Sequence, residues 1–130
     1  MHMRSWHAKK WLSKKAKRGF SGYPLVTLAF YGPDDRRASK VAVGVFQRPQ
    51  DEPPEPRRWF SQTGDVRADE TILTEIATFL RENGVRSVAM SDRIIGCPHE
   101  EGIDYPEGQN CPSCPYWAGR NRFTSELEET

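Results

Sequence analysis

All three cysteines of this chain lie within eighteen positions, from Cys97 to Cys114, together with His99, one of its three histidines. The four residues form two close pairs, a C-x-H pair and a C-x-x-C pair that begins at Cys111. Three cysteines cannot all form disulfides with one another, and four soft or borderline ligands in two close pairs are what tetrahedral zinc requires. The spacing therefore predicts a Zn²⁺ site whose ligands are Cys97, His99, Cys111 and Cys114.

Four protein ligands fill a tetrahedron, so the predicted site is structural and not catalytic. Pro98, Pro112 and Pro115 stiffen the two pairs and reduce the conformational entropy lost when a metal binds. Iron is the alternative ion. A redox pair formed by Cys111 and Cys114 is another interpretation, but the strand-then-helix context of such motifs is missing. Buried thiols beside a surface histidine are disfavoured because both pairs lie in polar, turn-like segments.

The sequence HEE followed by C-x-x-C matches part of the zinc deaminase signature, in which His99 would be a ligand and Glu101 the proton shuttle. Three features disfavour this activity. The span from Glu101 to Cys111 is too short for an intervening helix and strand, Asn110 replaces the proline of the signature, and Cys97 is placed to take the position of the catalytic water.

The segments GCPHEEGIDYPEG and CPSCPYWAGR resemble a segment carried by short uncharacterised bacterial proteins. The resemblance covers about the last half of the chain and brings no function with it. It implies a bacterial, cytoplasmic setting and supports the Cys/His set as a unit. The residues by themselves also make the cytoplasm the expected compartment, because no apolar h-region follows the basic N-terminus and no apolar run approaches the ~20 residues of a membrane span.

The middle of the chain predicts three consecutive strands at 23–31, 40–47 and 57–62, from their β-branched and aromatic residues. The first run is continuously apolar, so this strand is expected to be buried on both faces. A GPDDRRAS turn and a proline-rich loop at 48–56 separate the strands, which therefore form an antiparallel meander.

Residues 69–83 have the strongest helical pattern, with Asp69 as the N-cap and Gly84 after the last turn. Residues 85–92 then predict a fourth strand, which a crossover helix would place parallel to a neighbour. The expected fold is α+β, an antiparallel β-meander followed by a crossover helix and a fourth strand (β-β-β-α-β), with an appended zinc loop. The expected segments are a basic N-terminal helix or arm (1–22), an α+β core (23–95), a Cys/His zinc-binding loop (96–119) and a flexible polar tail (120–130).

Charge is distributed unevenly, because residues 1–33 carry +7 and the remainder carries −6. Ala8, Trp11, Leu12 and Ala16 have helical spacing, which predicts a helix with a thin apolar stripe and a lysine-rich back. Such asymmetry favours a polyanion, so nucleic acid, RNA or DNA, is the predicted partner. The candidate phosphate contacts are Arg4, Lys9, Lys10, Lys14, Lys15, Lys17 and Arg18, and the candidate stacking residues, if exposed, are Trp6, Trp11 and Phe20. The alternative is that the tryptophans pack the helix onto the sheet while the lysines face solvent.

Two further functions remain open beside this non-enzymatic module. The element order is similar to the opening half of the ribonuclease H-like fold, whose carboxylates hold two Mg²⁺ ions. Asp92 and either Glu70 or Glu75 match two of its positions, but the first strand offers no carboxylate, which disfavours a nuclease. The other alternative is a zinc-stabilised protein–protein adaptor, whose contact surface would be Ile103, Tyr105, Tyr116 and Trp117.

Overall fold

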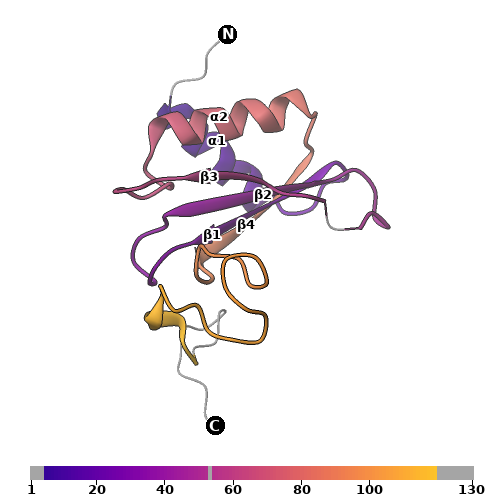
Figure 1. The fold of residues 1–130 in the computed structure, drawn as a ribbon. Helices are drawn as coiled ribbons and strands as arrows, with labels where there is room; N and C mark the ends of the chain where they lie inside the picture. Colours follow the sequence, from indigo (N-terminus) through magenta and orange to yellow (C-terminus); the bar gives the residue numbers. More distant parts are fainter. Residues whose placement is uncertain (1–4, 53, 120–130) are drawn as a thin grey trace.

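Four strands form one mixed sheet in the order β3-β2-β1-β4, and this arrangement confirms the predicted α+β class. The computed structural model describes residues 5–52 and 54–119. Strands β1, β2 and β3 form the antiparallel meander, and helix α2 carries the chain back so that β4 lies parallel to β1 (Figure 1). The elements are α1 (Ser5–Arg18), β1 (Leu25–Tyr31), β2 (Lys40–Phe46), β3 (Arg57–Phe60), α2 (Glu70–Glu82), β4 (Ser87–Ile94) and a 3₁₀ turn (Pro115–Trp117).

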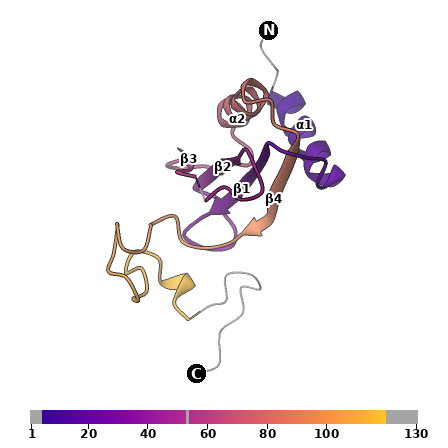
Figure 2. The same cartoon turned by 90° about the vertical axis from the view of Figure 1, so that its right-hand side faces the viewer.

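Both helices cover the same face of the sheet (Figure 2). Val26, Leu28 and Phe30 of β1 point into this layer and are buried, whereas the residues between them are half-buried. The expectation that β1 is buried on both faces is therefore wrong. The physical reason is that an apolar run in an antiparallel meander still alternates its side chains, and no helix of residues 5–52 and 54–119 covers the second face of this sheet.

Both helices contribute buried side chains to the hydrophobic core. Helix α2 begins after Asp69, whose side chain accepts a hydrogen bond of 2.9 Å from the Ile72 backbone N–H, as the cap predicted. Helix α1 packs against α2 and β4, and its Ala8 and Leu12 are buried in the same hydrophobic core as the strands. Trp11 is partly buried against that core. The basic helix α1 thus contributes side chains to the hydrophobic core and helps to enclose it.

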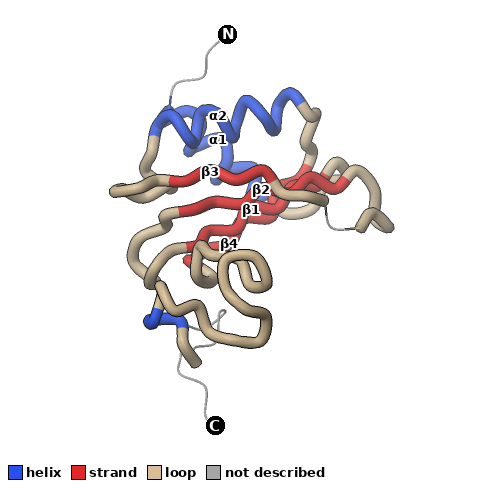
Figure 3. The backbone as a smooth tube through the Cα atoms, viewed as in Figure 1, coloured by secondary structure: helices blue, strands red, loops and turns tan. Residues whose placement is uncertain are grey.

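After β4 the chain enters a long loop at the carboxyl ends of β1 and β4, on the side of the sheet away from the helices (Figure 3). The parallel pairing of β1 and β4 continues into this loop, because Ile95 N–H donates to Phe30 O at 2.9 Å and Gly32 N–H donates to Gly96 O at 2.9 Å. The cysteine-bearing segment therefore starts from a fixed point. No helix within the described ranges has the length and apolar character needed to span a bilayer.

Candidate metal centre

The four residues singled out by their spacing come together in space. Cys97, His99, Cys111 and Cys114 each offer one ligand atom, and these atoms all lie within 4.8 Å of one another. Among the side chains that the structure describes, this is the group of His, Cys, Asp and Glu residues able to hold a metal ion. The prediction that the two pairs fold onto one point is confirmed.

Local backbone structure explains how each pair is shaped. In the first pair, the His99 N–H donates to Cys97 Sγ at 3.3 Å, which turns both side chains to the same side. In the second pair, Cys114 N–H donates to Cys111 O at 3.3 Å, and the turn brings the two sulfurs together. In the first pair this backbone N–H favours the thiolate of Cys97, the form that binds metal.

One ring nitrogen of His99 lies close to the sulfur atoms of all three cysteines. His99 Nδ1 lies 3.2 Å from Cys97 Sγ, 3.4 Å from Cys111 Sγ and 3.5 Å from Cys114 Sγ. In a zinc tetrahedron with Zn–S of about 2.3 Å and Zn–N of about 2.0 Å, a nitrogen and a sulfur ligand lie about 3.5 Å apart. The observed separations thus fit a single ion bound through His99 Nδ1.

Burial makes two of the thiols, those of Cys97 and Cys114, resist ionisation. Desolvation raises the pKa of Cys97, and its hydrogen bonds to Cys114 and Cys111 raise it further. Desolvation likewise raises the pKa of Cys114, with the nearby Cys111 adding to the effect. A divalent cation reverses this balance, because it compensates the charge that three adjacent thiolates would otherwise bring together.

The loop is attached to the sheet by polar contacts that sequence patterns did not reveal. Lys40 at the start of β2 has a side chain only 5% exposed, and its Nζ lies 3.6 Å from a Glu100 carboxylate oxygen. The same ammonium donates to Pro98 O at 2.9 Å, between the first two ligand positions. Arg58 of β3 donates to Glu100 at 2.8 Å. The hydrogen bond from Arg58, assisted by the charge of Lys40, lowers the pKa of Glu100.

A tryptophan provides the second attachment. Trp117 Nε1 donates to Gly32 O at 2.8 Å, and its ring packs against the hydrophobic core. Residue 117 follows the last candidate ligand by three positions, and Gly96, which pairs with Gly32, directly precedes the first. The loop that carries the Cys/His cluster is therefore attached to the end of β1 on both sides of the cluster. This contact assigns Trp117 a role inside the molecule, whereas Ile103 of the predicted adaptor surface is exposed.

A cavity of about 490 Å³ separates the loop from the open face of the sheet. Tyr31, Lys40 and Arg58 line it on the sheet side, and His99 and Asn110 line it on the loop side. Its two basic groups are engaged by Glu100, so its charges are largely balanced within the protein.

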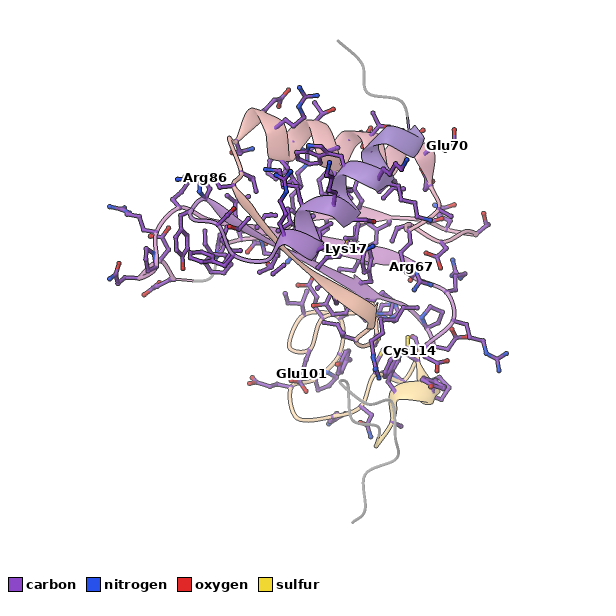
Figure 4. The ribbon with its side chains drawn as sticks, turned by 180° about the vertical axis from the view of Figure 1, so that it is seen from behind. Lys17, Arg67, Glu70, Arg86, Glu101 and Cys114 are labelled. Carbon is purple, nitrogen blue, oxygen red and sulfur yellow. The ribbon has the colours of Figure 1, made fainter. Side chains whose placement is uncertain are left out.

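The deaminase interpretation fails on placement. Glu101 is exposed and accepts a hydrogen bond of 3.2 Å from Gly108 N–H. Figure 4 shows Glu101 on the opposite side of the loop from Cys114, with its side chain directed outward. A proton shuttle has to face the metal-bound water, and Cys97 occupies the fourth ligand position where that water would bind.

The nuclease carboxylates are also not gathered into a site among the described side chains. Glu75 accepts a hydrogen bond of 2.8 Å from Trp59 Nε1, and Glu70 is exposed at the first turn of α2. The side chain of Asp92 lies outside the described residues. The resemblance to the ribonuclease H-like fold therefore remains one of strand order.

The predicted nucleic-acid residues divide into two groups. Lys15 Nζ donates to Val85 O at 3.2 Å and lies 5.4 Å from the Trp11 ring centre, so both side chains stabilise the packing of α1. Arg4 and the side chain of Trp6 lie outside the described residues. The remaining cations are exposed and form no ion pair with the acidic groups of the described residues: Lys9, Lys10, Lys14, Lys17 and Arg18.

Comparison of the chain with protein-family models, with curated proteins and with solved structures finds no match.

Proposed function

We propose that this chain is a zinc-binding protein in which a closed Cys₃His centre fixes the C-terminal loop against the end of the sheet. The observation that carries the proposal is the position of His99 Nδ1, within 3.5 Å of all three sulfurs. Zinc suits three thiolates and one imidazole better than the hard cations do. A centre built on reduced cysteines suits the cytoplasm, where we place the protein.

The role of the ion in this proposal is structural. Four protein ligands complete the tetrahedron, so a water molecule or substrate has no coordination position to occupy. The long loop contains little regular structure apart from its 3₁₀ turn, and a bound ion would stabilise it by linking residues far apart in its sequence. We therefore interpret the role of the ion as fixing the conformation of the C-terminal loop and of the surface that this loop presents.

Metal analysis tests the proposal directly. Protein purified under reducing conditions and without chelator is analysed by native mass spectrometry and elemental analysis. We expect one zinc per chain, and we expect Cys111→Ser and Cys114→Ser to lose it. His7→Gln, in the helix far from the loop, is the matched control and should keep full occupancy. Wild-type protein with no bound metal, or serine variants with undiminished occupancy, would refute the zinc centre.

We propose in addition that the outer face of α1 binds nucleic acid. The observation that favours this second function is the row of exposed cations without acidic partners among the described residues, since polyanion binding is driven by release of counterions from phosphates. Deleting the helix is a poor test because Ala8 and Leu12 belong to the core. Replacing Lys9, Lys10, Lys14 and Lys17 with glutamine keeps the core and removes the charge. Oligonucleotide affinity that is independent of salt, or unchanged in this variant, would refute the function.

A further inference from the structure

A groove of about 570 Å³ lies between the C-terminal end of α1 and strand β4. It is lined by Ala16, Gly19 and Phe20 on the helix side and by Leu25 and residues 87–91 on the sheet side. Strand β4 is the last strand of the sheet order on this side within the described residues. The groove therefore follows an open sheet edge, and none of its lining residues is charged.

Phe20 is the aromatic residue that this groove presents to solvent. Its side chain is 66% exposed, although its ring touches that of Tyr23 edge-on with a centre-to-centre distance of 5.3 Å. Trp11, by contrast, is partly buried under Lys15. A large exposed apolar ring costs solvation free energy, and a ring held by one edge contact keeps a face free for stacking.

Three cations are next to the groove lining along the chain. Lys17 and Arg18 directly precede Gly19, and Arg86 directly precedes Ser87; all three are exposed. Figure 4 shows Lys17 on the last turn of α1, above β4, and Arg86 at the beginning of the same strand. No ion pair joins these cations to an acidic group of the described residues. An uncharged floor with a basic rim is complementary to a strand whose bases are apolar and whose phosphates are anionic.

We propose that this groove binds single-stranded nucleic acid, with one base stacked on Phe20 and the neighbouring phosphates neutralised by Lys17, Arg18 and Arg86. The inference rests on the nucleic-acid binding proposed above and assigns it a site and a strand class. A duplex would leave Phe20 without an unpaired base to contact. A polypeptide strand paired with the β4 edge is the competing occupant, and it has no use for the three cations unless it is acidic.

Fluorescence anisotropy on the full chain tests the proposal. The probes are a labelled oligothymidylate of about 15 nucleotides, near the upper length bound by a single compact module, and a hairpin duplex with the same number of phosphates. Phe20→Ala should weaken oligothymidylate binding by about 5-fold or more, because stacking one base on an aromatic ring contributes about 1–3 kcal/mol. The matched control is Phe60→Ala, since Phe60 is 60% exposed on β3 at the other edge of the sheet.

The charge contribution is measured by the salt dependence. Replacing Lys17 and Arg18 together with glutamine should reduce the slope of log affinity against log salt by about 1.4, at about 0.7 per phosphate contact on a single strand. Phe20→Ala should leave that slope unchanged. The control pair Arg36→Gln and Arg48→Gln removes the same charge from exposed positions distant from α1 in sequence and should change neither quantity.

The outcomes separate the groove from the broader function. Salt-dependent wild-type binding that is equally strong in Phe20→Ala, or that prefers the duplex, would overturn the groove proposal and leave nucleic-acid binding by α1 in place. A wild-type protein that binds neither probe at low salt would overturn both. Binding that falls in Phe20→Ala and not in Phe60→Ala, with the predicted change of slope in the double variant, would support the site.

Discussion

Replacing Trp117 with phenylalanine should reveal whether metal binding and loop docking are one event. The substitution keeps most of the ring and removes the N–H that donates to Gly32 O at 2.8 Å. Gly32 is buried, so its carbonyl loses a partner that solvent replaces poorly. An unsatisfied buried acceptor costs about 1–3 kcal/mol, and the half-buried position of Trp117 places the expected loss at about 1–2 kcal/mol.

For a chain of this length, that loss corresponds to a decrease in melting temperature of about 4–7 °C. The metal state should control its size. In the proposed zinc-bound state, the residues on either side of the cluster are fixed and the Trp117 contact forms. After chelation under reducing conditions, we expect the four ligand residues to separate and the loop to leave the end of β1, so that the contact is lost before the substitution acts. Trp117→Phe should then cost nothing further.

Calorimetry or circular dichroism of four samples measures this coupling: wild type and variant, each with zinc and after chelation. The matched control is Trp59→Phe, which removes a similar hydrogen bond, of 2.8 Å to Glu75, from a tryptophan packed between the sheet and α2. That variant should lose the same stability in both metal states. An equal loss for Trp117→Phe with and without zinc would show that the ion does not hold the loop on the sheet, and our reasoning would be refuted.

Three further predictions concern the sheet and its connections. Asp65 has a side chain 23% exposed; burial alone would raise its pKa, but hydrogen bonds from Arg67 and from backbone N–H groups lower the pKa to about 2. Because the folded pKa lies below the ordinary value, Asp65→Asn should cost about 1–2 kcal/mol in urea unfolding near pH 6, and the difference should shrink as pH falls from about 4 toward 2; a constant difference would contradict this. Asp69→Ala removes the N-cap of α2 and should lower the free energy of unfolding by about 1 kcal/mol, while an unchanged value would show that another group caps the helix. Lys40→Met removes the donor to Pro98 O and should weaken zinc binding by about 10-fold in competition with a chromophoric chelator, as outer-shell contacts do, whereas undiminished affinity would limit Lys40 to a packing role.

Local patterns were sufficient to predict most of the secondary structure. The helix at 69–83 was recognisable because its cap, its apolar spacing and Gly84 agree, and the observed element is Glu70–Glu82. The burial of β1 was predicted wrongly because a continuous apolar run does not specify which layers will cover it. Sequence spacing also could not separate Trp11, which packs against the core, from Phe20, which is exposed.

The amino-acid sequence by itself determined the candidate ligand set, because three cysteines and one histidine with this spacing leave few chemical alternatives. It did not reveal the contacts that attach the set to the sheet. Lys40 and Arg58 are distant from Glu100 along the chain, and they meet it only because the meander brings β2 and β3 beside the loop. Helical spacing identifies one face of an element, but the partner of that face depends on packing between segments far apart in sequence. Tertiary structure therefore decided which basic and aromatic side chains stabilise the fold and which remain exposed to bind.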